Sequence, residues 1–115
     1  MLRPRLKIWL ESDRGEVALS DWRVQLLQAI DQHGSLAEAA RQLGVPYKTA
    51  WYKLKQMEAA LAVPLLVTSS GGAEHGGARL TAAGKEAIRR YTAIVGGVDA
   101  EIEQRFHDAF SDPLD

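Results

Sequence analysis

Apolar residues recur three and four positions apart between Gly34 and Leu61, which is the spacing of one helical face. They fall into two stretches: Leu36, Ala39, Ala40 and Leu43, then Ala50, Leu54, Met57 and Leu61. Ser35 is placed to cap the first helix, and Gly44 can take the left-handed conformation that ends it. Pro46 lies near the first position of the second helix, where its missing N–H costs nothing. Two helices joined by so short a turn predict a helix-turn-helix, a unit that places its second helix in the major groove of DNA.

The residues before this unit predict a strand pair followed by a helix. Residues 5–10 alternate between apolar and polar, so we expect a half-buried strand there and a short return strand near residues 17–19. Ser20 has the place of an N-cap for a helix that ends near His33. The buried stripe of this helix is expected to contain Trp22, Leu26, Ala29 and Ile30.

A second strand pair and a final helix are predicted after residue 61. Residues 65–68 and 78–80 predict short strands on either side of a Gly-rich stretch, which together make a β-hairpin wing. Thr81 is placed to cap a long helix whose apolar residues step by three and four, as in a coiled-coil seam. We expect this seam to pair two copies of the chain through Ile88, Tyr91, Val95, Val98 and Ile102. Gly96 and Gly97 interrupt the helix at about 1 kcal/mol each relative to alanine, so a kink or break is expected.

Together these elements predict a mainly α protein with a small β component, a winged helix-turn-helix. Its parts are a short N-terminal strand pair, a three-helix core, a two-stranded wing and a long C-terminal dimerisation helix. We expect the winged helix-turn-helix domain to span residues 1–81, and the dimerisation arm with its acidic tail to span residues 82–115. The chain has 115 residues, of which 46% are hydrophobic and 25% charged, so it is large enough to bury a core without cross-links.

Charge is distributed unevenly, although the net charge is only −1. Residues 1–95 hold 13 Lys and Arg against 9 Asp and Glu, whereas residues 96–115 hold 1 against 6. Local patches rather than the total steer an approaching phosphate, so the basic body is compatible with nucleic acid. The chain has no cysteine, no signal-peptide core and no apolar run near the ~18 residues of a membrane span. We therefore expect a cytoplasmic protein without a metal, a cofactor or a membrane partner.

The second helix of the helix-turn-helix, residues 47–61, is the candidate DNA-reading element. Advancing about 100° per residue from Ala50 places one set of residues opposite the core: Lys48, Tyr52, Lys55 and Ala59. Thr49 and Gln56 lie on one flank, and Trp51 lies on the other. Because the N-terminal part of such a helix reaches base edges, we expect base contacts from Lys48, Thr49 and Tyr52. Lys53 and Lys55 are expected to meet phosphates.

Other candidates have a structural alternative beside the functional one. Tyr47 either bonds a phosphate or packs inward, and Trp51 either contacts DNA or packs beside the core. In the wing, residues 69–78, we expect Arg79 at its edge to meet the DNA backbone. The side chains of Ser69, Ser70 and His75 could assist it, but a glycine cluster is most often only a turn.

The stretch GSLAEAARQLGVPYKTAWYKLKQME closely resembles the N-terminal DNA-binding domain of molybdate-responsive ModE-type transcriptional regulators, which are related to the LysR-type winged helix. The opening RLKIWLE resembles the first strand of that family. Tyr47-Lys48 with Ala50-Trp51 resembles the start of its recognition helix, and this run is the more specific part of the match. The resemblance covers about residues 5–95. It implies a homodimer, built largely through the long C-terminal helix, on a near-palindromic operator.

The sequence departs from the family in two respects. Pro46 stands where the resemblance suggests serine, which removes a possible phosphate-binding hydroxyl. Full-length members continue into oxyanion-binding domains, whereas this chain stops at Asp115. We therefore expect a stand-alone DNA-binding domain without a molybdate-binding domain, and any effector stays open.

Two other classes of function compete with this one. A winged helix can serve as a protein-interaction module without DNA specificity, and the acidic residues 99–115 could bind a basic partner or mask the chain's own lysines. An enzyme is not expected, because the histidines at 33, 75 and 107 fall in different elements. Carboxylates such as Glu58 and Glu74 have no evident partner, and no cluster has the spacing of metal ligands.

Overall fold

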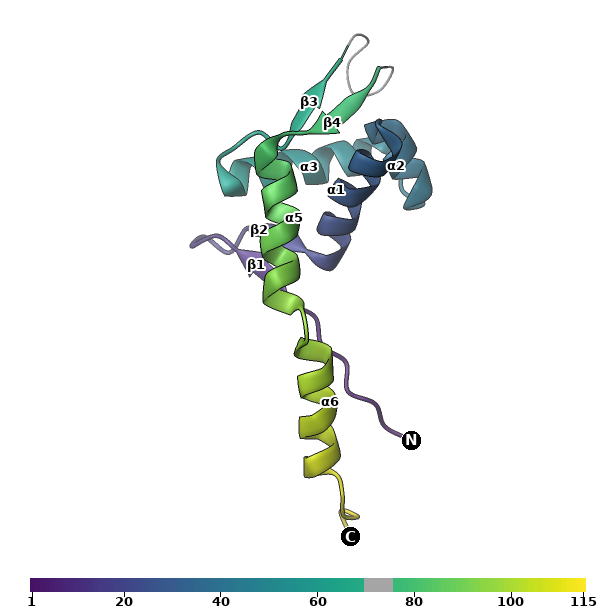
Figure 1. Ribbon diagram of the computed structural model, residues 1–115, viewed down its shortest axis with the longest axis vertical. Helices are drawn as coiled ribbons and strands as arrows, with labels where there is room; N and C mark the ends of the chain where they lie inside the picture. Colours follow the sequence, from purple (N-terminus) through teal and green to yellow (C-terminus); the bar gives the residue numbers. More distant parts are fainter. Residues whose placement is uncertain (70–75) are drawn as a thin grey trace.

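Helices and two separate antiparallel strand pairs follow one another in the predicted order. They are β1 (Trp9–Glu11), β2 (Val17–Ser20), α1 (Asp21–His33), α2 (Leu36–Gln42), α3 (Tyr47–Leu61), β3 (Leu66–Thr68), β4 (Ala78–Leu80), α5 (Ala82–Val95) and α6 (Val98–Ala109). The computed structural model describes residues 1–69 and 76–115. The molecule measures 64 × 29 × 21 Å because α6 projects from the body that the other elements form (Figure 1). The predicted class, mainly α with a small wing, is confirmed.

The core lies where α1, α2, α3 and α5 meet the inner faces of β2 and β4. Its most deeply buried large side chains are Leu26, Leu27, Ile30, Leu36, Leu54, Met57 and Leu65. Removing a side chain of this kind from water stabilises the fold by about 1.5–3 kcal/mol. The predicted stripes of the helix-turn-helix are confirmed, with Leu43 and Leu61 half-buried at its edges. The α1 stripe is also confirmed, except that Trp22 is half-buried.

The predicted helix caps are present in the structure. Ser20, Ser35 and Thr81 each accept a hydrogen bond from the backbone N–H three residues ahead, at 3.2, 2.9 and 3.0 Å. These bonds satisfy donors that the first turn of a helix leaves unpaired. Gly44 has a φ of +69°, so it makes the left-handed turn that the sequence predicted between α2 and α3. Pro46 sits at the N-cap of α3, one residue before the helix begins.

The wing is fixed to the body at its base. Strands β3 and β4 pair with Leu66 opposite Leu80 and Thr68 opposite Ala78. The Ala78 N–H donates to the carbonyl of Gly34 at 2.8 Å, which ties β4 to the end of α1. A Cβ at Gly84 would lie 2.7 Å from the Leu65 carbonyl oxygen, so only glycine lets α5 pack this closely on the start of the wing.

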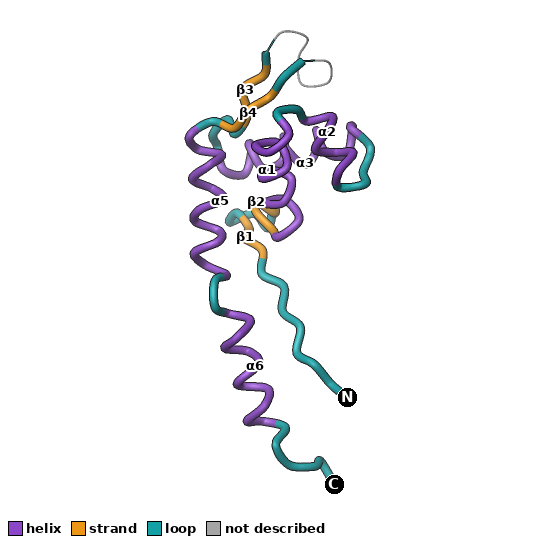
Figure 2. The backbone as a smooth tube through the Cα atoms, turned by 45° about the vertical axis from the view of Figure 1, so that its right-hand side comes forward, coloured by secondary structure: helices purple, strands orange, loops and turns teal. Residues whose placement is uncertain are grey.

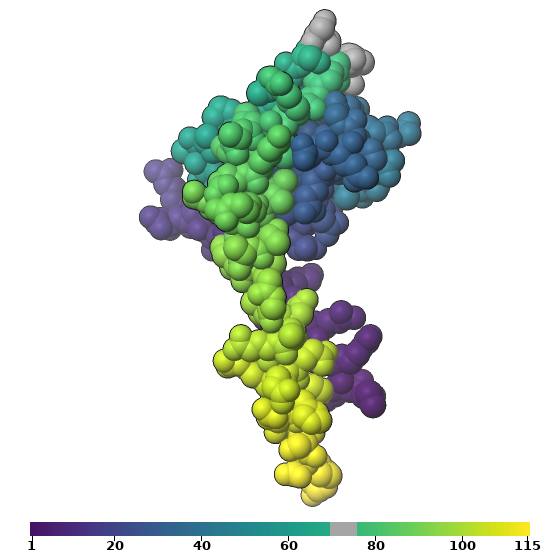
Figure 3. All heavy atoms as spheres, viewed as in Figure 1, coloured from purple at the N-terminus to yellow at the C-terminus, as the bar shows by residue number. Residues whose placement is uncertain are grey.

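The N-terminal strand is shorter than predicted. The sequence predicted a strand over residues 5–10, but β1 comprises only Trp9–Glu11, and Leu6 is exposed. The register explains the difference, because Trp9 pairs with Ser20 and the chain turns into α1 at the next residue. Residues before Trp9 therefore have no strand to pair with. Residues 1–8, the N-terminal arm, run instead from the body along the side of α6 (Figures 2 and 3).

The C-terminal helix breaks at the two glycines. α5 ends at Val95, Gly96 is extended, and Gly97 takes a φ of +81° at the N-cap of α6. The single long helix predicted for residues 82–115 is therefore two helices, broken where the sequence indicated a weak point. Among the described residues, no helix has both the length and the apolar character needed to cross a membrane.

Candidate nucleic-acid interface

The outward face of α3 carries exposed basic and aromatic side chains. Lys48, Tyr52 and Lys55 are exposed, as the helical geometry predicted, and Tyr52 retains 58% of its accessible surface. The opposite face buries Ala50, Leu54 and Met57 in the core. Because the inner face is locked by packing, the outer face is presented in a fixed orientation. The predicted exposure is confirmed, while contact of these residues with DNA stays a prediction.

One flank of α3 forms a short chain of charged and aromatic contacts. The Lys55 ammonium lies 5.7 Å from the centre of the Trp51 ring and 3.1 Å from a Glu58 carboxylate oxygen. The other Glu58 oxygen accepts the Leu65 N–H at 2.8 Å. The expectation that Glu58 lacks a partner is therefore wrong, because the turn after α3 brings Leu65 back to it. Trp51 is 43% exposed, so it does not pack into the core.

The lysines of α3 differ in whether a carboxylate lies beside them. The charge of Lys55 is partly balanced by Glu58. Within the described residues, Lys48 and Lys53 form no ion pair with a carboxylate. A phosphate would find these two lysines free, whereas it would compete with Glu58 for Lys55.

The other flank is held by a buried arginine that sequence reasoning missed. Arg23, on the inward side of α1, is only 7% exposed. Its Nη1 donates to the Val17 carbonyl at 2.9 Å and its Nη2 to Gln56 Oε1 at 3.0 Å. Burial lowers the pKa of the guanidinium, because removal from water disfavours the charged form. The available signal was an arginine three and four residues before the buried Leu26 and Leu27, on the apolar stripe of α1.

Three of the candidates on α3 lie closer to the core. Tyr47 is half-buried and packs against the hydrophobic core, so the structure shows the packing alternative for its ring. Thr49 and Lys53 are also half-buried, on the same flank as Gln56. None of these positions removes a residue from the surface of α3.

The wing and α3 lie at the same end of the molecule, opposite α6 (Figure 1). Arg79 is exposed on β4, where it pairs in register with the exposed Val67 of β3. The hydroxyl of Ser69 accepts the Gly77 N–H at 2.8 Å and donates to the Gly77 carbonyl at 3.2 Å, so it closes the wing. The predicted roles of Ser70 and His75 fall outside the described residues.

The first part of the predicted dimer seam is covered by the chain itself. Tyr91 is 4% exposed, and its hydroxyl donates to the Ile8 carbonyl at 2.7 Å. Burial, together with the nearby Asp21, raises the pKa of Tyr91. Ile88 and Val95 pack against the same core. On these three residues the apolar spacing reflects packing of α5 within one protomer.

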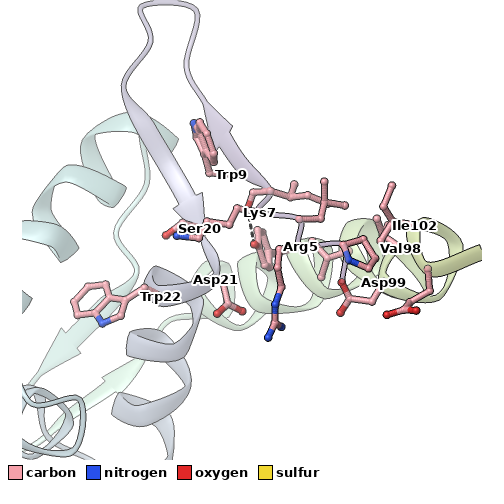
Figure 4. A pocket seen from close by; sticks show the side chains of 15 residues that line it. Arg5, Lys7, Trp9, Ser20, Asp21, Trp22, Val98, Asp99 and Ile102 are labelled. Carbon is pink, nitrogen blue, oxygen red and sulfur yellow. Dashed lines mark hydrogen bonds between the residues drawn. The ribbon is translucent and has the colours of Figure 1, made fainter. Parts of the chain in front are cut away.

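The second part of the seam remains accessible. α6 has no buried residue, and Val98, Ile102 and Phe106 are half-exposed along one side of it. A cavity of about 700 Å³ separates this side from the N-terminal arm (Figure 4). Its lining includes Arg5 and Lys7 of the arm and three acidic residues: Asp21, Asp99 and Glu103. The acidic helix thus lies beside the basic arm, and it extends away from α3 (Figure 2).

Those residues weighed for catalysis that the structure describes are not brought together. His33 lies in the last turn of α1 and His107 in the last turn of α6, while His75 and Glu74 lie outside the described residues. In the described part of the chain, no three His, Cys, Asp or Glu side chains are grouped to hold a metal ion.

Residues 23–85, from the buried Arg23 to the first turn of α5, match the family described as "Bacterial regulatory helix-turn-helix protein, lysR family". The chain belongs to this lysR-type family. The match contains the helix-turn-helix and the wing, and it leaves out the N-terminal arm, β1, β2 and α6. The predicted relation to LysR-type winged helices is therefore confirmed.

Relatives of this lysR-type chain carry names that refer to molybdenum. It is 46% identical over 76 residues to the "Molybdenum-pterin-binding protein MopB" of Rhodobacter capsulatus, which covers 66% of this chain and 28% of that protein. It is 33% identical over 90 residues to the "DNA-binding transcriptional dual regulator ModE" of Escherichia coli (strain K12), covering 78% of this chain and 32% of that protein. The chain thus matches about a third or less of the length of these relatives. The predicted resemblance to ModE-type regulators is confirmed.

A solved structure supports the same relation. The "Crystal structure of CbnR_DBD-DNA complex" superposes with a TM-score of 0.59 at 29% identity, covering 73% of this chain and 94% of that one. The two chains therefore share the fold over most of the lysR-type domain. These comparisons establish a helix-turn-helix domain of the lysR family that is related to ModE-type regulators.

Proposed function

We propose that the chain acts as a homodimer that binds specific DNA sequences and regulates transcription. Helix α3 enters the major groove, and the wing, residues 69–78, follows the sugar–phosphate backbone. The observation that carries the proposal is the outer face of α3, where exposed Lys48 and Tyr52 stand on a helix whose inner face is fully buried. The similarity to a DNA-bound relative supports it. As a DNA-binding regulator of a bacterial family, the protein would work in the cytoplasm.

Base reading is assigned to the first two turns of α3. Lys48 can donate to the O6 and N7 acceptors of guanine, and the methyl group of Thr49 can pack on a thymine methyl. Tyr52 lies one turn further along the same exposed side and offers both a ring and a hydroxyl. Phosphate contacts, which position the protein without reading sequence, are assigned to Lys53, Lys55 and Arg79. Tyr47 and Trp51 border this surface at its two edges.

The dimer is assigned to the accessible part of the seam. Val98, Ile102 and Phe106 give α6 an apolar stripe that packing within one protomer leaves half-exposed. Pairing two such helices would bury the stripe and would place two copies of α3 on one face of DNA. Their separation would be about one helical turn, roughly 34–36 Å, or a multiple of it. Ile88, Tyr91 and Val95 would support this pairing from within each protomer.

The test compares two lysines of α3 on two kinds of DNA. Genomic pull-down identifies the bound sequence, and titrations then measure affinity for that site and for random duplex. Lys48→Ala should weaken binding to the specific site more than to random duplex. Lys53→Ala should weaken both alike and reduce the salt dependence by about one phosphate. Lys85→Ala, a change at an exposed lysine of α5, controls for the lost charge.

Two outcomes would contradict the proposal at different levels. Equal losses for Lys48→Ala on both kinds of DNA would remove its base-reading role. A wild-type protein that binds no duplex at low salt would exclude DNA binding altogether, and the interaction-module alternative would then be favoured.

A further inference from the structure

Gln56 is a residue of α3 whose polar side chain is held by a buried residue of another helix. Its Oε1 accepts the hydrogen bond from Arg23 Nη2 across 33 positions of sequence. Arg23 is in turn fixed by the Val17 carbonyl at the start of β2. The two bonds of Arg23 therefore join β2, α1 and α3 at one point, and they hold the oxygen of the Gln56 side chain against Arg23.

The chemistry of arginine determines which way the Gln56 amide points. A guanidinium has five N–H donors and no acceptor, so only the amide oxygen of Gln56 can face it. The amide N–H₂ group must then point away from Arg23. No described group accepts a hydrogen bond from this nitrogen. In the described residues no buried side-chain nitrogen or oxygen lacks a partner, so the Gln56 nitrogen is accessible to solvent.

The exposed N–H₂ group lies beside the DNA-facing row of α3. Gln56 is one turn beyond Tyr52 and three residues beyond Lys53, so all three share one side of the helix. It is the tenth of the 15 residues of α3, in the half that follows the base-reading turns. In a complex with α3 in the major groove, a donor in this position would face the backbone of the duplex, where amide side chains commonly bind phosphate oxygens.

We propose that Gln56 contacts a phosphodiester oxygen of bound DNA, and that Arg23 is the positioning residue that aims its N–H₂ group. This inference rests on the proposed DNA-binding function. It assigns a neutral contact to the flank opposite Lys55. A glutamate at this position would give Arg23 a stronger, charge-assisted partner, but it would turn a negative oxygen toward the phosphate. The amide satisfies both neighbours at once, because it offers an oxygen inward and a donor outward.

Two variants of Gln56 separate its contact with DNA from its contact with Arg23. Gln56→Glu keeps an acceptor for Arg23 and removes the outward donor. Gln56→Leu removes both and adds no charge. Gln28→Glu, on the exposed face of α1, is the matched control for one added negative charge. Each variant is measured twice in the full chain: by the midpoint of thermal unfolding, and by affinity for random-sequence duplex at low salt.

We expect the two variants to change stability in opposite directions and to lower DNA affinity alike. The unfolding midpoint should rise for Gln56→Glu and fall for Gln56→Leu, because only the first keeps a partner for the buried arginine. Affinity for DNA should fall by about tenfold or more in both variants. The reference is Gln28→Glu for Gln56→Glu, and the wild type for Gln56→Leu.

Four results would overturn the inference. If affinity follows stability, Gln56 is only structural. If Gln56→Glu loses affinity while Gln56→Leu binds like the wild type, the loss is charge repulsion and no donor is used. A wild type that fails to bind duplex removes the proposed function and this inference together, whereas normal wild-type binding with unaffected variants removes the inference alone.

Discussion

Helices α3 and α6 are both amphipathic and of similar length, but they differ in what covers their apolar side. In α3 the apolar side is fully buried in the core by residues such as Leu54 and Met57. In α6 no residue is buried, and Val98, Ile102 and Phe106 are only half-covered. In α3 the polar side is therefore accessible to a ligand, whereas in α6 the apolar side is accessible. One protein thus presents two surfaces with opposite chemistry at its two ends.

Amphipathic spacing therefore identifies the apolar face of a helix, but it does not show whether that face packs within its own protomer or against a second copy. The spacing of Ile88, Tyr91 and Val95 predicted a contact between two copies, yet Tyr91 is buried within its own protomer. The same spacing continues into α6, where no other part of the body covers it. Burial separates the two cases, and burial is a property of the assembled fold.

We expect the greatest loss of stability when the packing beneath α3 is disturbed. Leu54→Ala should lower the free energy of unfolding by about 2–5 kcal/mol, because it leaves a cavity beneath α3. Chemical denaturation monitored by circular dichroism measures this loss. A change below about 1 kcal/mol would mean that the inner face of α3 is less tightly packed than its burial indicates.

The next effect tests the uncovered helix. Ile102→Asp should weaken the proposed dimer by about tenfold or more, because pairing would bury a charged side chain. The unfolding of the protomer should hardly change, since Ile102 contributes nothing to the core cluster. Sedimentation over a range of concentrations measures the association, with Gln104→Asp on the same helix as the control. An unchanged dimer would exclude this side of α6 as the interface.

A smaller effect concerns the link between the body and the arm. Tyr91→Phe should cost about 1 kcal/mol, the usual net value of one hydrogen bond, through loss of the bond to the Ile8 carbonyl. The pKa of Tyr91 is raised above its ordinary value of 10.0, so the folded state holds this proton more tightly than the unfolded state does. Stability from this group should therefore be complete below pH 10 and should fall as the pH rises above it.

Unfolding measured between pH 9 and pH 11 tests this prediction. Tyr91→Phe should be less dependent on pH than the wild type in that range. If both proteins lose stability in parallel, another group is responsible for the alkaline dependence.

The smallest effect is expected on the exposed side of α5. Hydrogen bonds from Arg89 and Arg90 lower the pKa of Glu86 to about 2, although its side chain is half-exposed. Its contribution to stability should be present above pH 4.5 and should be lost as the pH falls toward 2. Glu86→Gln should leave the unfolding midpoint at pH 7 nearly unchanged, because solvent screens exposed ion pairs. A large shift would show that this pair is coupled to the core.

Local signals explain why so much of the fold was predictable. The helix-turn-helix depends on apolar spacing, on the cap at Ser35 and on a left-handed Gly44, all of which act within a few residues. The N-terminal strand was predicted too long because its length depends on where β2 ends. The partners of Glu58 and Gln56 were missed for a similar reason. Glu58 meets Leu65 only after the chain turns back, and Gln56 meets Arg23 only when α1 and α3 pack together.

Gly96 and Gly97 form a joint between α6 and the body that the other elements form. Gly97 has a backbone conformation that side chains strongly disfavour, so this joint is specific to glycine. A small rotation at that residue is multiplied by the length of the molecule before it reaches α3. In the proposed dimer, the spacing of the two α3 helices along the duplex would therefore depend on the backbone conformation of Gly97.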